Sequence, residues 1–163
     1  MPPKNVFLIG LTDTDRARLR FIRNADRYVF HGVLDPAEFL ETYEFPIKNM
    51  LMRAEDQLRC WEADSGKIVD GIGAYLDFPV STMLPILCAR LGRRGPGLES
   101  LLKCEHKYWS RLVQNEVIPQ HIPGFQAFDP FDENIWERIS LALPFWIKPI
   151  KACGSMLGFY IEG

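Results

Sequence analysis

The sequence predicts an α/β fold, in which a small, doubly wound parallel sheet precedes a shorter α+β region. Along the first half, apolar runs and helical stripes alternate in the order strand, helix, strand, helix, strand, helix, which is typical of parallel sheets. The run Val6–Ile9 is continuously apolar and ends at Gly10, as expected of a central strand. A third observation is the apolar stripe over 47–65, which repeats at helical spacing.

Helix-start signals mark the first elements of the chain. Thr12 and Asp15 form a capping-box-like helix start, and Pro36 suits the first position of a second helix. We expect a strand over 5–10, a helix to about Ala25, a strand over 28–32 and a short helix from Asp35–Pro36 through Tyr43.

The long stripe predicts a helix over 47–65, and Gly66 follows at the position where a left-handed residue is expected. A third strand over 68–72 contains Asp70. The next helix starts near Pro79, runs to about Leu91 and contains Pro85, which should kink it. Ligands of such sheets bind at the carboxyl ends of the strands. No G-x-G-x-x-G motif follows the first strand, so a dinucleotide site is not expected there.

Composition excludes several classes of protein. The chain has 163 residues, of which 47% are apolar and 25% charged, and its net charge of −2 gives no electrostatic case for nucleic acid or an anionic membrane as the main partner. The apolar runs are too short for a membrane helix, and no signal peptide opens the chain. Four widely spaced cysteines without a C-x-x-C pair predict reduced thiols, and the three histidines lack zinc-ligand spacing.

In the second half, Lys103, Lys107 and Arg111 recur every four residues along an expected helix, which by itself is typical of a solvated face. Lys148 ends a short apolar strand before a small-residue loop. A fixed ammonium followed by backbone N–H donors is well suited to a nucleotide. The expected elements are helix 98–115, connector 118–124, strand 125–128, helix 132–141, strand 145–147 and strand 159–161.

Several segments together resemble the opening of an ATP-grasp domain, the superfamily of biotin carboxylase, carbamoyl phosphate synthetase and D-alanine–D-alanine ligase. Residues 1–95, with Asp70-Gly71-Ile72 and Asp77-Phe78-Pro79, are similar to the pre-ATP-grasp, Rossmann-like domain that precedes it. The ATP-grasp resemblance rests on Leu102–Arg111, Ile118-Pro119, Pro123-Gly124-Phe125, Pro144–Pro149 and the loop to Gly158.

The resemblance implies two domains, 1–95 and a truncated 96–163, and ATP with Mg²⁺ as cofactors. Lys107 and Lys148 match the two nucleotide-contacting lysines of the family, although His106 stands where an aspartate is usual. The loop that would close over the phosphates contributes Cys153, Gly154, Ser155, Met156 and Gly158.

By the same resemblance, the chain is the N-terminal fragment of a cytoplasmic ATP-dependent carboxylate–amine or carboxylate–thiol ligase. The intact enzyme would form an acyl phosphate from a small carboxylate, with Mg²⁺ ligands expected beyond residue 163. The fragment alone should bind nucleotide weakly and turn over nothing. If Lys148 binds phosphate, its side chain should be exposed or paired in the empty protein, because burying an unpaired ammonium is costly.

Two other interpretations stay open at this point. The chain could be a non-catalytic assembly or regulatory module, and homo-oligomerisation fits either interpretation. Asp13 and Asp15 could belong to the acidic pocket of a response-regulator receiver, although carboxylates at a helix N-terminus are the simpler explanation. Asp70 is poorly placed as a phosphoacceptor, because it lies within the expected third strand.

Overall fold

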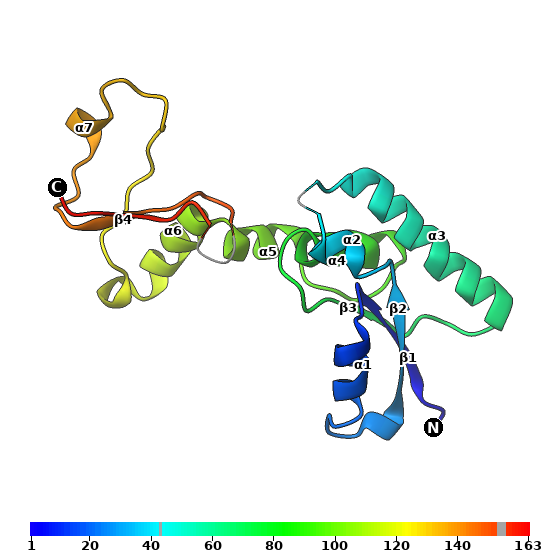
Figure 1. The fold of residues 1–163 in the computed structure, drawn as a ribbon. Coiled ribbons are helices and arrows are strands. Elements are labelled where there is room, and N and C mark those ends of the chain that lie inside the picture. The colour runs from blue at the N-terminus through cyan, green and yellow to red at the C-terminus, as the bar shows by residue number, and fades with distance from the viewer. Residues whose placement is uncertain (43, 153–155) are drawn as a thin grey trace. The chain divides into compact units, whose positions relative to one another are not determined.

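The structure, a computed structural model, describes residues 1–42, 44–152 and 156–163. The chain divides into two compact units, 1–98 and 99–163 (Figure 1). Each unit is described by itself. The expected helix end at Tyr43 and the loop residues Cys153, Gly154 and Ser155 lie outside the described residues.

The first unit is built on a three-stranded sheet in the order β2-β1-β3 (Figure 1). All its strands are parallel, with Phe7 placed opposite His31 on one side and Ile72 on the other. The strands are β1 (Lys4–Ile9), β2 (Tyr28–Val33) and β3 (Gly71–Gly73). The predicted α/β class with a parallel sheet is therefore confirmed.

Helices pack on both faces of this sheet. On β2, the ring of His31 lies 5.0 Å from that of Trp61 in α3, whereas a Cβ at Gly32 would meet Arg16 of α1. Because neighbouring residues of a strand point to opposite faces, α1 and α3 lie on opposite sides. The helices of this unit are α1 (Asp13–Leu19), η1 (Ala25–Arg27), α2 (Ala37–Leu40), α3 (Ile47–Ser65) and α4 (Val80–Arg90).

The core of the first unit lies between the sheet, α3 and α4. Leu58, Met83 and Ile9 are each 0% exposed, and burial of side chains of this size stabilises a fold by about 1.5–3 kcal/mol each. The buried cluster consists of Phe7, Ile9, Val33, Leu34, Phe39, Met50, Leu51, Ala54, Leu58, Val69, Val80, Met83 and Leu87. The apolar stripe predicted for 47–65 is thus the buried face of α3.

The predicted helix to Ala25 is wrong, because α1 ends at Leu19. The N–H groups of Phe21 and Ile22 bond three residues back, to Arg18 and Leu19, which tightens the chain into a turn. Both side chains are exposed and so give no packing energy to continue the helix. At the other end of α1 the prediction is confirmed, since the Thr12 hydroxyl accepts a hydrogen bond from the Asp15 N–H at 3.1 Å.

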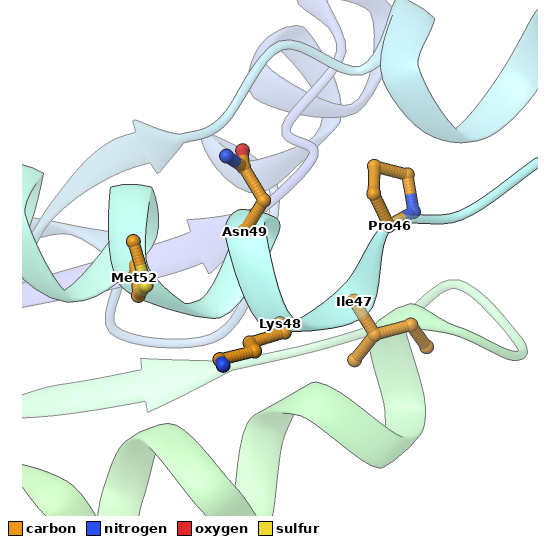
Figure 2. Close-up of a pocket in the computed structure, with 5 residues that line it drawn as sticks. All are labelled: Pro46, Ile47, Lys48, Asn49 and Met52. Carbon is orange, nitrogen blue, oxygen red and sulfur yellow. The ribbon is translucent and has the colours of Figure 1, made fainter.

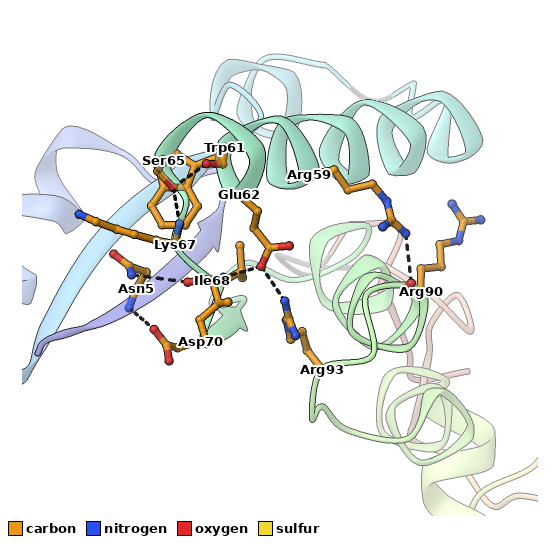
Figure 3. A network of polar contacts seen from close by, with 11 residues as sticks. Asn5, Arg59, Trp61, Glu62, Ser65, Lys67, Ile68, Asp70, Arg90 and Arg93 are labelled. Atoms are coloured by element: carbon orange, nitrogen blue, oxygen red, sulfur yellow. Dashed lines mark hydrogen bonds and ion pairs between the residues drawn. The ribbon is translucent and has the colours of Figure 1, made fainter. Parts of the chain in front are cut away.

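The third strand begins later than predicted, at Gly71 rather than at 68. The N–H of Val69 donates to Glu62 at 2.7 Å, and the carboxylate of Asp70 accepts from the N–H of Asn5 at 2.7 Å. These side-chain bonds accompany a single backbone bond before Gly71, from the N–H of Asp70 to the carbonyl oxygen of Asn5 at 2.9 Å (Figure 3). Gly66 adopts the left-handed conformation expected after α3, with φ of 64°.

Glu62 also joins α3 to the segment after α4. Its Oε1 accepts from Arg93 Nη2 at 2.6 Å and from the Val69 N–H, so one carboxylate holds three parts of the unit together (Figure 3). The bond from Val69, opposed by burial and aided by Arg93, lowers the pKa of Glu62. Just beyond, a Cβ at Gly95 would lie 2.6 Å from Cys88, so this approach requires glycine.

The second unit is made of short elements. The predicted helix over 98–115 is two helices, because His106 leaves helical geometry and caps the second one. The strands predicted at 145–147 and 159–161 are confirmed, and they pair with each other in antiparallel orientation. The elements are α5 (Leu98–Glu105), α6 (Lys107–Val117), η2 (Pro119–His121), α7 (Ile135–Arg138), β4 (Phe145–Ile147) and β5 (Phe159–Ile161).

Two further predictions in this unit are wrong. Residues 125–128 form no strand, and the helix predicted over 132–141 is the single turn α7. The side chain of Gln126 explains both, because it donates to Arg138 O at 2.6 Å and accepts from Ser140 N at 2.9 Å. These bonds hold the segments in irregular conformations. No described residue of 99–163 is fully buried.

Candidate functional site

Lys148 follows β4 directly, as the sequence predicts. The β4–β5 pair places Trp146 opposite Tyr160, and the Nζ atom of Lys148 lies 5.5 Å from the centroid of the Trp146 ring. The lysine is exposed, as expected of a cation that would bind phosphate, and the aromatic face offers its charge a weak partner. Its ammonium is therefore accessible in the empty protein.

Lys107 opens α6 and contacts the segment that follows Lys148. Its N–H donates to the carbonyl oxygen of Ile150 at 3.0 Å, and its Nζ donates to the carbonyl oxygen of Ala152 at 2.6 Å. The Lys107 ammonium thus lies at the residue directly before the small-residue loop. Within the described ranges, neither Lys107 nor Lys148 forms an ion pair, so both positive charges are left uncompensated by carboxylates.

His106 positions Lys107. Its Nδ1 accepts a 3.1 Å hydrogen bond from the N–H of Trp109, which satisfies one free donor at the start of α6. An imidazole can accept through Nδ1 when that nitrogen carries no proton. The histidine therefore does what an aspartate would do at this position, and it turns the chain so that Lys107 begins a new helix.

Part of the predicted phosphate loop is described. Met156 is exposed and Gly158 half-buried, and Leu157 between them has a left-handed φ of 52°. Cys153, Gly154 and Ser155 lie outside the described residues, as stated above. The structure therefore brings Lys107 next to the start of this loop, and the roles of the loop residues stay predictions.

The sequence analysis missed an aromatic pair beside Lys148. Trp146 and Tyr160 are 60% and 47% exposed, and their ring centroids lie 5.1 Å apart. Large exposed rings of this kind are typical of binding surfaces. The sequence did contain a signal for an aromatic residue beside Lys148. Side chains two residues apart in a strand point to the same side, which places Trp146 and Lys148 together.

Two hollows of the described residues are defined by side chains other than Lys107 and Lys148. One, of about 480 Å³, lies along the start of α3 and is lined by Pro46, Ile47, Lys48, Asn49 and Met52 (Figure 2). Lys48 and Asn49 extend in different directions there and do not converge on a ligand. The other, of about 260 Å³, lies within 126–138, where Asp132 already pairs with Arg138 at 2.8 Å.

The acidic residues after β1 lie in the first turn of α1, which Thr12 caps. Asp15 accepts from the hydroxyl of Thr12 at 2.6 Å, and this bond lowers the pKa of Asp15. Asp70 is bound to Asn5, as described above. These partners fit the helix N-terminus interpretation, and they do not form the open carboxylate pocket of a receiver.

In the parts of the chain that the structure describes, no group of three histidine, cysteine, aspartate or glutamate side chains could hold a metal ion. Cys60, Cys88 and Cys104 are free thiols, as predicted, and Cys153 is not described. None of the described helices combines the length and apolar character needed to span a bilayer.

Comparison with known proteins gives a class of fold. No family model matches the chain, and no curated protein matches it. Among solved structures, a match to a ligase shows a similar fold.

That structure is the L-amino acid ligase from Bacillus licheniformis, with a TM-score of 0.56. The match has 13% sequence identity and covers 100% of this chain and 40% of the ligase chain. At this identity the likeness concerns the fold alone. The chain spans two-fifths of the length of the structure that it resembles.

Proposed function

We propose that the chain is the N-terminal part of an ATP-dependent carboxylate–amine or carboxylate–thiol ligase. In the intact enzyme, a substrate carboxylate would attack the γ-phosphorus of ATP and release ADP. The amine or thiol would then attack the acyl phosphate and release inorganic phosphate. The likeness to an L-amino acid ligase supports a ligase-like fold, and the lysine pattern supports ATP as the phosphoryl donor.

The observation that carries this proposal is the bond from Lys107 Nζ to the carbonyl oxygen of Ala152. It joins α6 to the segment between Lys148 and the loop, so both lysines belong to one local structure. The Lys107 ammonium has two further N–H donors that this bond does not use. A triphosphate between the lysines would gain charge-assisted hydrogen bonds from both.

The aromatic pair extends this site. A purine ring stacked on the free face of Trp146 would bring a nucleotide close to Lys148, whose Nζ lies 5.5 Å from the centroid of that ring. Base–aromatic stacking contributes about 1–3 kcal/mol per base in other proteins. The residues that fit ATP here are therefore Lys107, Lys148, Trp146 and Tyr160.

Mg²⁺ would neutralise charge on the transferred phosphoryl group in such a ligase. The described residues contain no donor set that fits this ion. We therefore assign no residue of 1–42, 44–152 or 156–163 to the metal.

Direct nucleotide binding tests the proposal. Calorimetric titration of the protein with ATP should give weak binding, and Lys148→Ala or Lys107→Ala should reduce the affinity at least tenfold. Lys67→Ala is the matched control, since Lys67 is an exposed lysine in the other unit. Equal affinities for all four proteins would contradict the proposal. ATP hydrolysis by these residues alone, lost in Lys148→Ala, would show that they are not a fragment of a larger active site.

A non-catalytic assembly module is the second candidate. It is favoured by the large exposed side chains of the second unit, such as Phe131 and Trp136, which are 90% and 65% exposed. Sedimentation with and without ATP separates the two functions. Self-association that ATP does not alter, together with the absence of ATP binding, would favour the module.

A further inference from the structure

A cluster of exposed arginines lies at the turn between α1 and η1. We name it the arginine patch, and it consists of Arg18, Arg20, Phe21, Ile22, Arg23 and Arg27. The segment 16–27 holds five arginines in a chain whose net charge is −2, so positive charge is concentrated here. The turn lies at the amino ends of β1 and β2, away from the strand ends where α/β sheets bind ligands (Figure 1).

The positive charges of this patch are largely uncompensated. Within the described parts of the chain, Arg20, Arg23 and Arg27 form no ion pair, and Arg18 makes a long contact of 3.5 Å with Asp15. Arg16 is outside the patch, because its Nη1 donates to the carbonyl oxygen of Phe30 and so serves the fold. Several guanidinium groups therefore remain free to bind a partner.

Apolar side chains stand between these arginines. Phe21 is 77% exposed and Ile22 41% exposed, and the guanidinium carbon of Arg20 lies 4.9 Å from the centroid of the Phe21 ring. Tyr28 and Val29, at the start of β2, are also exposed. A mixture of exposed aromatic, aliphatic and arginine side chains is the composition of protein–protein interfaces.

The turn holds this surface in place. Phe21 N–H bonds to Arg18 O at 3.0 Å, and Arg27 N–H bonds to Asn24 O at 3.0 Å. Asn24 has a left-handed φ of 58°, which fixes the direction of the chain before η1. A preformed surface loses less conformational entropy on binding than a flexible one.

The chemistry of the patch points to one kind of partner. All its cations are arginines, and no lysine occurs between Lys4 and Lys48. Arginine binds carboxylates through two parallel hydrogen bonds and is enriched at protein interfaces, where lysine is depleted. We propose that the arginine patch docks an acidic polypeptide segment in which carboxylates flank an apolar side chain.

Nucleic acid and membranes fit less well. Asp13, Asp15 and Asp26 border the patch and interrupt its positive charge, whereas a phosphate backbone or an anionic lipid surface presents continuous negative charge. Separate carboxylates, in contrast, can pair with individual guanidinium groups between the aspartates.

Fluorescence anisotropy tests this inference with a labelled 12-residue peptide that carries six glutamates around one leucine and one phenylalanine. We expect binding in 50 mM salt that weakens as salt is raised. The double variant Arg20→Gln/Arg23→Gln should lose about tenfold in affinity, and Phe21→Gln should lose affinity without a change in salt dependence. The control is Arg94→Gln/Arg111→Gln, which removes the same charge from exposed positions outside the patch and should bind as the parent does.

Parallel arms use single-stranded oligothymidine and vesicles of phosphatidylserine and phosphatidylcholine. The inference is overturned if the peptide does not bind, or if both double variants reduce its binding equally. Tighter, patch-dependent binding of the oligonucleotide or of the vesicles would also overturn it and would reassign the patch to that partner. Thermal unfolding of each variant verifies that the turn still folds.

Discussion

The hydroxyl group of Tyr75 donates a 2.8 Å hydrogen bond to the carbonyl oxygen of Gly10. The same hydroxyl accepts a 3.1 Å bond from the N–H of Thr12. The Tyr75 hydroxyl therefore joins the end of β1 to the loop after β3. Both lie at the carboxyl edge of the sheet, where the chain has passed from one side of β1 (β2) to the other (β3). A tyrosine occupies the place where parallel sheets commonly bind ligands.

Tyr75→Phe should lower the free energy of unfolding by about 1–3 kcal/mol, because it removes two hydrogen bonds and leaves the Gly10 carbonyl and the Thr12 N–H without that partner. Urea unfolding followed by circular dichroism measures this change. Tyr28→Phe is the control, since Tyr28 is an exposed tyrosine of the same unit, and it should be neutral. Equal stabilities for Tyr75→Phe and the parent would mean that water replaces the hydroxyl.

Glu62→Ala should destabilise the first unit by about 1–3 kcal/mol. It removes the acceptor for the N–H of Val69 and leaves Arg93 partly buried without its partner. Glu62→Gln should cost less, because its oxygen can still accept from Val69. Urea midpoints of the two variants check the order. Equal losses would show that the charge of Glu62, rather than its hydrogen bonds, is what matters.

His31 should make the protein less stable in mild acid. Burial, with Arg16 and Lys67 nearby, lowers the pKa of His31 below its ordinary value of 6.5. Above pH 6.5 the side chain is neutral in both the folded and the unfolded states. As the pH falls below 6.5, the unfolded chain binds the proton first, so the free energy of unfolding decreases until the pH passes the folded pKa.

Urea unfolding at pH 7.5 and at pH 5.5 measures this effect for the parent and for His31→Phe. The variant keeps an aromatic ring against Phe7, whose centroid lies 4.5 Å from that of His31. Its stability should change less between the two pH values than that of the parent. The same change in both proteins would assign the pH dependence to other groups.

His106→Ala should cost about 1 kcal/mol in stability, because it removes the cap of α6. His106→Asp should retain the cap, since a carboxylate also accepts from the Trp109 N–H and favours a helix N-terminus. Hydrogen exchange of the first amides of α6 provides the readout. Unchanged protection in His106→Ala would show that the bond at 3.1 Å does not stabilise the helix.

In the first unit, the elements predicted correctly are those for which the sequence shows one clear hydrophobic pattern. The run Val6–Ile9 and the stripe over 47–65 were correct because burial against one core fixes both. The end of α1 could not be predicted in this way. Phe21 and Ile22 continue an apolar pattern, but tertiary packing does not cover them, so the helix stops.

The second unit was harder to predict because side chains, rather than periodicity, determine its backbone. Gln126 holds 125–128 and 138–140 in irregular conformations, and His106 divides an expected helix in two. Lys148 was placed correctly at the end of its strand. The contact of Lys107 with Ala152 required a tertiary structure, because 45 residues separate the two in the chain.

The arginine patch shows that the net charge of a chain does not reveal how its charges are distributed over the surface. A chain at −2 gave no reason to expect a cationic surface, yet charge segregates within 16–27. Spacing of the arginines was visible in the sequence. Their exposure became clear from the structure, as did the absence of ion pairs at Arg20, Arg23 and Arg27 within the described part of the chain.

Because Gly95 lies so close to Cys88, the reactivity of the Cys88 thiol measures local opening of the first unit. Cys88 is 1% exposed and its burial raises the pKa of the thiol, so an alkylating reagent can reach it when the chain near Gly95 opens. In a background where Cys60, Cys104 and Cys153 are replaced by serine, the rate of Cys88 alkylation measures how often that opening occurs. The same thiol would register any partner or nucleotide that holds this part of the protein closed.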